Sequence, residues 1–460
     1  METASRAPKG WGLHFQCALL AQGWAHDVRL TIDDGSIAQI ECGVQPQAGD
    51  ERAVLGLPGM PNVHSHAFQR GMAGLTEHRG TELDTFWTWR ELMYRFLAHM
   101  TPDDLEAITA QAYVEMLEAG FTRVGEFHYL HHDPNGQPYT DSAEMSTRVV
   151  NAAERTGIAL TLLPVFYAHG GFGGIPPVAG QRRFICELDR YVRLLEANRM
   201  LVAKLKHARV GIAPHSLRAV TPEELAILLP LAAADPIHLH VAEQVREVEA
   251  CQAWSGKRPV EWLFEHAPVD ARFCLVHATH MTSEETQRFA KSGAVAGLCP
   301  VTEANLGDGY FPGVEFHQAG GAFAIGTDSN VAISVSEELR MLEYGQRLQR
   351  RARNLFGGHD QSTGRVLFEG AVRGGAKALG VAAGLDLGAP ADLVSLDLSR
   401  PQFVGREGDR MLDSWIFGGV SGAVDRVWRA GIEVVTNGRH KDREAIAARY
   451  RSTLENLLRA

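Results

Sequence analysis

The long middle part of the chain alternates between short apolar runs and segments with helical spacing. Eight apolar runs have the length and composition of buried strands, and amphipathic stretches follow several of them. Two of these stretches begin with a threonine before acidic residues, at Thr101 and Thr221, which is a usual helix start. Eight strands that alternate with helices predict an α/β fold, the (β/α)8 TIM barrel. The predicted strands cover residues 59–66, 121–129, 159–167, 210–216, 237–243, 273–280, 294–300 and 322–330.

Both ends of the chain show a different pattern. Up to about Leu57, short β-rich runs are broken by Asp-Gly and Gly turns, and similar material returns near the other end. We expect these two segments to pair into one small β-sandwich beside the barrel. The predicted organisation is a sandwich from residues 1–57 and 385–440, a barrel domain from residues 58–384, and a C-terminal helix from residues 441–460.

Composition and charge exclude several classes of protein. The net charge of −10 argues against a general affinity for nucleic acid or anionic membranes, since both need a basic surface. The six cysteines are scattered without a CxxC pair, which disfavours a disulfide framework or a thiolate zinc site. The first residues lack an apolar signal region, and no run approaches the ~20 apolar residues of a membrane span. We therefore expect a cytoplasmic protein that acts on a small molecule, with no nucleic-acid or membrane partner.

Polar residues interrupt the predicted strands at their carboxyl ends, where barrel enzymes place their catalytic groups. The first strand ends in His64-Ser-His66, and alternation along a strand puts both imidazoles on one face, where they can chelate one ion. A single strand histidine is more often a hydrogen-bonded core residue, and an Asp after a strand is usually a turn residue. Burying the whole set without a metal would be costly, so the sequence predicts a metal centre. The other members of the set are His240 and Glu243 on the fifth strand, His277 on the sixth and Asp328 on the eighth.

Four of these segments resemble the amidohydrolase superfamily of metal-dependent hydrolases. They are PGMPNVHSHAFQRG (58–71), HLHVAEQ (238–244), LVHATH (275–280) and GTDSN (326–330), and the resemblance covers nearly the whole chain. It implies a barrel of amidohydrolase type with a sandwich from both chain ends. It also implies one Zn²⁺ per chain, bound by His64, His66, His240 and Asp328. Glu243 is then the proton shuttle, and His277 lies with Asp328 near the attacking water.

The number of metal ions depends on a bridging group. Binuclear relatives usually carry a carboxylated lysine at the end of the fourth strand, where this chain has Ala-Pro-His215-Ser. Glu126 on the second strand could serve as a bridge, but an orienting carboxylate is the preferred interpretation. One ion is therefore expected. Zinc lowers the pKa of bound water towards ~7, and an acid beside it can protonate leaving ammonia, which favours deamination of a small C–N substrate.

Further segments are similar to the formimidoylglutamate deiminase family of histidine degradation. They are FWTWRELMYR (86–95), GEFHYLHHD (125–133), HSLRAVTP (215–222), CQAWSGKRP (251–259) and TEANLGDG (302–309). Members of that family hydrolyse N-formimino-L-glutamate to N-formyl-L-glutamate and ammonia. The resemblance implies that Arg90 and Arg218 bind the substrate carboxylates, which a guanidinium matches in a bidentate way. It also implies that Gln69, Tyr129 and His215 surround the formimino group and the substrate backbone, and that the protein is a homodimer.

The chain departs from that family at two places, and two alternatives remain. Asn330 stands where a histidine is expected, and Cys299-Pro300-Val301 also differs. The first alternative is another mononuclear deaminase, acting on guanine or a related base, which needs groups that read a ring edge rather than two arginines. The second is a barrel without metal that serves as a binding or assembly protein. The complete set of ligand residues disfavours that second alternative.

Overall fold

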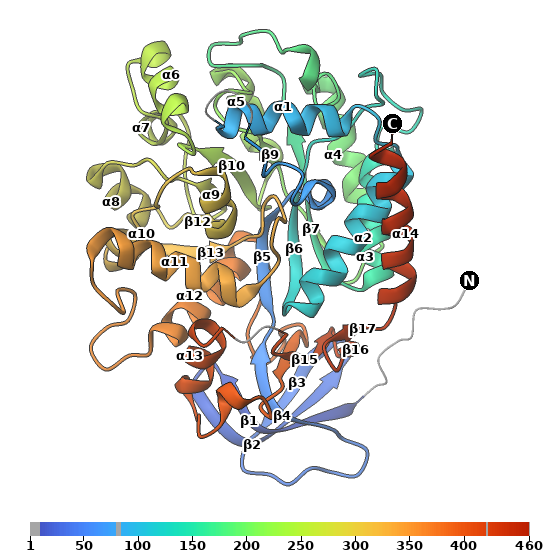
Figure 1. Ribbon diagram of the computed structural model, residues 1–460, viewed down its shortest axis with the longest axis vertical. Helices are drawn as coiled ribbons and strands as arrows, with labels where there is room; N and C mark the ends of the chain where they lie inside the picture. Colours follow the sequence, from blue (N-terminus) through green and yellow to red (C-terminus); the bar gives the residue numbers. More distant parts are fainter. Residues whose placement is uncertain (1–9, 80–83, 420–421, 460) are drawn as a thin grey trace.

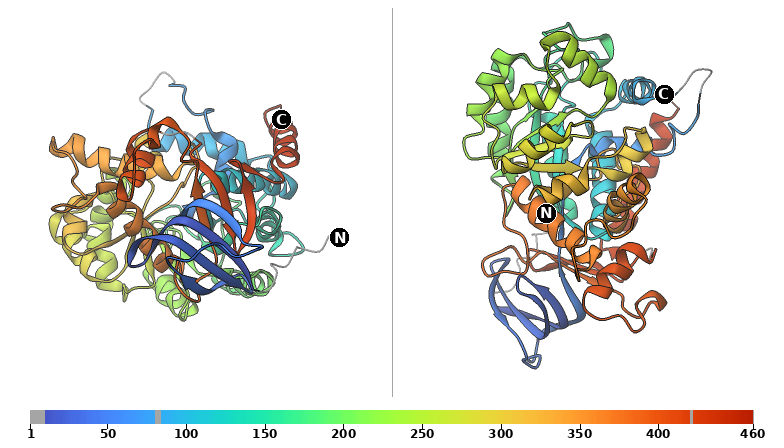
Figure 2. Two further views of the ribbon diagram at one scale, coloured as in Figure 1. Left: turned by 90° about the horizontal axis from the view of Figure 1, so that it is seen from below. Right: turned by 90° about the vertical axis from the view of Figure 1, so that its left-hand side faces the viewer.

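The computed structural model describes residues 10–79, 84–419 and 422–459, which form a barrel ringed by helices and a sheet against one end of it (Figure 1). Residues 1–9 of the predicted sandwich and residue 460 of the predicted C-terminal helix lie outside the described residues. The view along the barrel shows strands from both chain ends covering that end (Figure 2).

All eight predicted barrel strands are present, and neighbouring strands pair in parallel. The fourth is split into two short pieces, β8 and β9. Single bridges close the barrel, between Ser65 and Asp328 and between Ser216 and His240. The strands are β5 (Met60–Ser65), β6 (Phe121–His128), β7 (Ala159–Phe166), β8 (Arg209–Val210), β9 (Ala213–Pro214), β10 (Ile237–Val241), β11 (Phe273–His277), β12 (Val295–Leu298) and β13 (Ala322–Ile325). The predicted TIM barrel is confirmed.

The two threonine helix starts are also confirmed. The hydroxyls of Thr101 and Thr221 accept the backbone N–H groups of Asp104 and Glu224, and each acidic side chain bonds back to the threonine N–H. Helices α2 (Pro102–Glu118) and α5 (Pro222–Leu231) begin there. The other helices of the barrel are α1 (Phe86–Leu97), α3 (Glu144–Thr156), α4 (Leu188–Val202), α6 (Val245–Ser255), α7 (Pro259–His266), α8 (Ser283–Lys291), α9 (Pro300–Leu306), α10 (Gly313–Gln318), α11 (Val335–Arg350) and α12 (Thr363–Ala378), with short 3-10 turns at Ala67–Met72 and Ala179–Gln181.

The chain ends form one eight-stranded sheet, in the order β17-β16-β15-β14-β4-β1-β2-β3. Strand β14 pairs with β4, so the two ends of the chain meet in its middle. The rings of Phe15 on β1 and Trp428 on β15 lie 5.9 Å apart, although two strands separate β1 from β15. The sheet therefore curls onto itself, which confirms the predicted sandwich. Its strands are β1 (Trp11–Leu20), β2 (Gly23–Asp33), β3 (Ser36–Glu41), β4 (Glu51–Pro58), β14 (Leu393–Leu396), β15 (Val424–Arg429), β16 (Ile432–Thr436) and β17 (Arg439–His440).

Three elements complete the C-terminal part of the chain. A 3-10 turn (Pro401–Phe403) and α13 (Asp409–Phe417) interrupt the strands, which the sequence pattern did not predict. Helix α13 buries Leu412, Trp415 and Ile416 and packs on α11 and α12. Helix α14 (Arg443–Leu457) packs against α2. The predicted domain boundaries stay predictions, and within the described ranges no helix is long and apolar enough to cross a membrane.

Candidate active site

Four side chains converge at the carboxyl ends of the barrel strands. His64 lies in β5 and His66 directly follows it, His240 comes from β10, and Asp328 follows β13. The Nε2 atom of His64 lies 3.2 Å from that of His66 and 3.0 Å from that of His240. The Asp328 Oδ1 atom lies 3.4 Å from His64 Nε2 and 3.3 Å from His66 Nε2. Ligands ~2.0–2.1 Å from a tetrahedral ion are about 3.3 Å apart, close to these four distances. His64, His66 and Asp328 form one group that could hold an ion, and His64, His240 and His277 form a second group that shares His64.

The protonation of the imidazoles supports the same conclusion. His66 donates from Nδ1 to the Phe127 carbonyl at 2.9 Å, and His240 donates from Nδ1 to the His215 carbonyl at 3.0 Å. The Nε2 atoms of His66 and His240 then carry lone pairs that face His64 Nε2. A proton on His64 Nε2 could donate a hydrogen bond to only one of these two lone pairs. Burial lowers the pKa of all three imidazoles, to about 3 for His64, so they are neutral and ready to bind a cation. The donor set fits a metal ion.

Glu126 is occupied elsewhere. Its Oε1 accepts the Ala67 N–H at 2.7 Å and its Oε2 accepts the Tyr113 hydroxyl at 3.2 Å. Burial raises the pKa of Glu126 to about 8, which favours the neutral acid at pH 7. A neutral carboxyl with both oxygens engaged is a poor bridging ligand, so the geometry favours one ion over two.

Glu243 and His277 lie beside the ligand cluster. The His277 Nε2 atom is 3.8 Å from Glu243 Oε1 and 3.8 Å from Asp328 Oδ2, while its Nδ1 faces Glu303 Oε1 at 3.2 Å. Burial raises the pKa of Glu243 to about 7. Burial alone would lower the pKa of His277, but the three surrounding carboxylates outweigh it and raise the pKa to about 10. The pair thus places a carboxyl that titrates near neutrality against an imidazole that stays protonated.

Several rim residues adopt the left-handed backbone region, which is unusual for residues other than glycine. His277 has a φ of 66°, and Asp328 and Asn330 have φ values of 42° and 55°. Close approach also constrains this rim, because a Cβ on Gly326 would lie 2.8 Å from the His64 carbonyl oxygen. The turns after β11 and β13 are therefore held in conformations that aim His277 and Asp328 at the centre.

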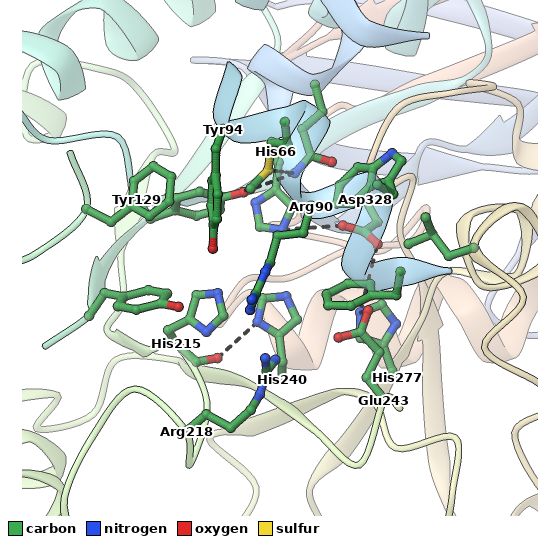
Figure 3. A pocket seen from close by; sticks show the side chains of 17 residues that line it. His66, Arg90, Tyr94, Tyr129, His215, Arg218, His240, Glu243, His277 and Asp328 are labelled. Carbon is green, nitrogen blue, oxygen red and sulfur yellow. Dashed lines mark hydrogen bonds and ion pairs between the residues drawn. The ribbon is translucent and has the colours of Figure 1, made fainter. Parts of the chain in front are cut away.

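A pocket opens above the ligand cluster, and all the predicted substrate-binding residues line it. Figure 3 shows Arg90 from α1 and Arg218 from the segment after β9 entering it from opposite sides. Gln69 donates to the Tyr129 hydroxyl at 3.0 Å, and its buried Oε1 has no hydrogen-bond partner among the described residues. The predicted residues that line the pocket are His66, Gln69, Arg90, Tyr129, His215, Arg218, His240, Glu243, His277 and Asp328, while His64 lies fully buried beneath it.

Several residues beside these predicted site residues were not predicted from the sequence. Trp87 lies under two of the guanidinium groups, with its ring centroid 4.6 Å from Arg90 Cζ and 5.8 Å from Arg218 Cζ. Glu303 orients His277, and it belongs to the segment TEANLGDG that carried the family resemblance, so a signal for it was present. The remaining pocket residues that were missed are Phe86, Trp89, Met93, Tyr94, Tyr167, Phe184 and Leu306.

The histidine expected at position 330 is replaced by an asparagine that fits its place. The Asn330 side chain is fully buried, and its amide nitrogen lies within hydrogen-bond distance of Ser65 Oγ, the His66 carbonyl and the Asp328 carbonyl. Its Oδ1 accepts the Thr327 hydroxyl at 2.6 Å. This departure from the family pattern therefore ties together the two turns that carry metal-ligand candidates.

Comparisons with known proteins identify hydrolases of the amidohydrolase type as relatives of this chain. Residues 55–434 match the amidohydrolase family, and residues 13–54 match the family described as formimidoylglutamate deiminase HutF, N-terminal domain. A formimidoylglutamate deiminase of Pseudomonas aeruginosa is 51% identical over 445 residues, which cover 96% of this chain and 98% of that protein. An 8-oxoguanine deaminase of the same species is 28% identical over 455 residues, which cover 93% and 94%.

Solved structures agree with the observed fold. The crystal structure of an amidohydrolase from Brucella melitensis has a TM-score of 0.95 and 54% identity, and covers 97% of this chain and 100% of that one. An adenosine deaminase from Xanthomonas campestris with bound zinc has a TM-score of 0.81 and 20% identity, with coverage of 99% and 100%, and shows the fold alone. The resemblance to formimidoylglutamate deiminases and the expected class, a hydrolase acting on C–N bonds other than peptide bonds, are both confirmed. The chain belongs to the amidohydrolase family.

Proposed function

We propose that this protein hydrolyses N-formimino-L-glutamate to N-formyl-L-glutamate and ammonia, as a zinc-dependent formimidoylglutamate deiminase of histidine degradation. The observation that carries the proposal is the placement of Arg90 and Arg218 in one pocket with the ligand cluster. The substrate has two carboxylates and one amidine-like carbon, and the pocket offers two guanidinium groups and one hydrolytic centre. The Pseudomonas aeruginosa relative, 51% identical, supports the same reaction.

The metal would be held by His64, His66, His240 and Asp328, whose donor atoms are within 3.4 Å of His64 Nε2. When bound, a zinc ion lowers the pKa of a coordinated water towards ~7. Nitrogen and oxygen ligands also bind other divalent ions, so zinc itself is part of the proposal.

The chain's own residues move the protons. Glu243 takes a proton from the attacking water and gives it to the formimino nitrogen as a bond forms between the water oxygen and the formimino carbon. Glu243 then takes the remaining hydroxyl proton and gives it to the same nitrogen. The C–N bond breaks, ammonia leaves, and the formyl C=O remains. A general base with a pKa near the working pH is the most effective, and the pKa of Glu243 is about 7. His277, fixed through Glu303, and Asp328 hold the attacking oxygen in line with the carbon.

The remaining pocket residues orient the substrate. The two guanidinium groups bind its carboxylates, and a buried charge-assisted hydrogen bond stabilises by about 1.5–3 kcal/mol. The unpaired Oε1 of Gln69 can accept an N–H of the formimino group, and Tyr129 and His215 lie beside it in the same wall. The predicted cytoplasmic location and homodimer stay predictions.

Deamination of guanine or a related base is the alternative. A pocket for a neutral purine has no need of two arginines, and their terminal nitrogens would face the bound base without a carboxylate to bind. Arg90 and Arg218 therefore favour the amino-acid substrate. The relative at 28% identity, an 8-oxoguanine deaminase, makes the comparison worth an experiment.

The test is ammonia release by the zinc-loaded protein from N-formimino-L-glutamate, with guanine and 8-oxoguanine in parallel. We expect release from the formimino compound alone. Arg218→Ala should lower kcat/KM by about 10–150-fold, the kinetic equivalent of one lost charge-assisted bond, while Arg288→Ala on the exposed face of α8 should not. Release from a purine, or none from the formimino compound with zinc bound, would contradict the proposal.

A further inference from the structure

Behind the pocket lies a buried carboxylate that takes no part in the proposed proton transfers. Glu247 is in the first turn of α6, and its side chain is 0% exposed. One carboxylate oxygen, Oε2, accepts the backbone N–H of Glu243 at 3.0 Å. Isolated buried charges are costly, so a carboxylate that stays in this position needs a cationic partner.

The cationic partner is Arg218. Its Nε atom lies 3.9 Å from Glu247 Oε1, and neither atom has a hydrogen-bond partner among the described residues. Burial alone would lower the pKa of Arg218, but Glu247, together with Tyr167, Glu243 and Tyr94, outweighs it and the pKa is raised. Because the Nε edge of the guanidinium faces Glu247, the terminal nitrogens remain for the pocket, where Figure 3 shows them below His240.

We infer that Glu247 is a positioning residue that fixes both the substrate-binding Arg218 and the backbone of the proton shuttle Glu243. Its two oxygens make separate contacts: Oε2 accepts the backbone N–H of Glu243 in the segment after β10, and Oε1 faces the guanidinium that receives a substrate carboxylate. The inference rests on the proposed function, since it names how one pocket aligns a carboxylate clamp with a proton shuttle. It adds a residue that does not itself touch the substrate.

The two tasks can be separated by substitution. In Glu247→Gln, the amide oxygen can still accept the Glu243 N–H, but the amide NH2 then faces the Nε–H of Arg218, donor against donor. Arg218 loses its orientation while Glu243 keeps its own. Glu247→Ala removes both supports. Glu249→Gln, at an exposed position of the same helix, is the matched control.

Steady-state kinetics with N-formimino-L-glutamate then give a distinctive pattern. We expect Glu247→Gln to raise KM by about tenfold, equal to about 1.4 kcal/mol, with kcat within about threefold of the parent. Glu247→Ala should raise KM and also lower kcat by about tenfold or more, and Glu249→Gln should change neither. The inference would be overturned if Glu247→Gln lowered kcat by the same factor as it raised KM, or if it changed neither.

A double-mutant cycle separates positioning from a general loss of folding. If Glu247 acts through Arg218, Glu247→Gln should change KM by less than about twofold in an Arg218→Ala background. A change as large as in the parent would overturn the inference, whatever the melting temperatures. If the parent releases no ammonia, the proposed function fails, and the same cycle is run on the affinity for glutarate, a plain dicarboxylate, by calorimetry. Non-additive losses there would still support Glu247, and additive ones would refute it.

Discussion

Replacing Asn330 tests how the ligand-bearing turns are held together. Its amide nitrogen has two hydrogens for three nearby acceptors, on Ser65, His66 and Asp328, and its oxygen accepts one hydroxyl, from Thr327. That amounts to three full hydrogen bonds, at about 1 kcal/mol each. The backbone φ of 55° adds about 1 kcal/mol when alanine replaces asparagine, which tolerates the left-handed region. Asn330→Ala should therefore lower the free energy of unfolding by about 4 kcal/mol.

An isosteric change separates hydrogen bonding from packing. In Asn330→Asp the volume is retained, but an oxygen replaces the NH2 group and faces three oxygen atoms. We expect a loss of about 3 kcal/mol or more, because the new carboxylate oxygen is buried against the His66 and Asp328 carbonyl oxygens, which cannot donate to it. Asn305→Ala is the control. That amide makes a single exposed hydrogen bond, to Glu77, and its loss should cost less than about 0.5 kcal/mol.

The assay is urea unfolding followed by tryptophan fluorescence, on zinc-loaded and zinc-free protein, together with zinc titration of each variant. Because Asn330 ties the turn after His66 to the turn at Asp328, its loss should also weaken zinc binding by about 10–100-fold. A loss below about 1 kcal/mol in Asn330→Ala, with zinc affinity unchanged, would refute the reasoning. That result would mean that the backbone bridge between Ser65 and Asp328 is sufficient to hold the metal-ligand candidates in place.

Three further outcomes follow from the same structure. If free zinc is present at a thousand times its Kd, removing it with a chelator should lower the free energy of unfolding by about 4 kcal/mol. Calorimetry with and without zinc tests this, and an unchanged unfolding transition would contradict a metal site. Glu303→Gln should lower kcat about 10–100-fold with zinc content unchanged, because His277 loses its orienting carboxylate, and kinetics beside metal analysis test this. His440 donates to the Thr156 carbonyl, and burial lowers the pKa of its imidazole. Below the pKa of a histidine in the unfolded chain, about 6.5, the unfolded state takes up a proton that the folded state does not, so the contribution of His440 to stability is lost as the pH falls. His440→Gln should thus lose less stability than the parent between pH 7 and 5 in urea unfolding, and an equal loss would show that His440 does not titrate there.

Much of the barrel could be predicted because its strands are buried on both faces. Strand β7 has every residue buried, and such a strand appears in a sequence as a nearly continuous apolar run, here ALTLLPVF. The helix starts at Thr101 and Thr221 are local as well, since a threonine and an acidic residue three positions later satisfy each other's backbone N–H groups. Helix α13 was missed because it lies between strands of the sandwich and is stabilised by distant helices, α11 and α12.

The metal-ligand candidates could be predicted because they follow from the local pattern of the strands. Alternation along the chain predicts one face for the imidazoles of His64, in β5, and His66, directly after it, and the strand ends of a barrel share one rim. The sequence by itself therefore determined the type of fold and which candidate ligands lie together at one rim of it.

Only the tertiary structure decided how those groups are aimed. The pairing of Glu247 with Arg218, the support of His277 by Glu303 and the ring of Trp87 beneath the arginines all join segments far apart in the chain or on different elements. The left-handed turns at the rim persist because packing around them outweighs their local cost, which no local preference reveals. The physical reason is that residue type and spacing fix which face a side chain occupies, whereas its partners depend on contacts that exist only after the barrel closes.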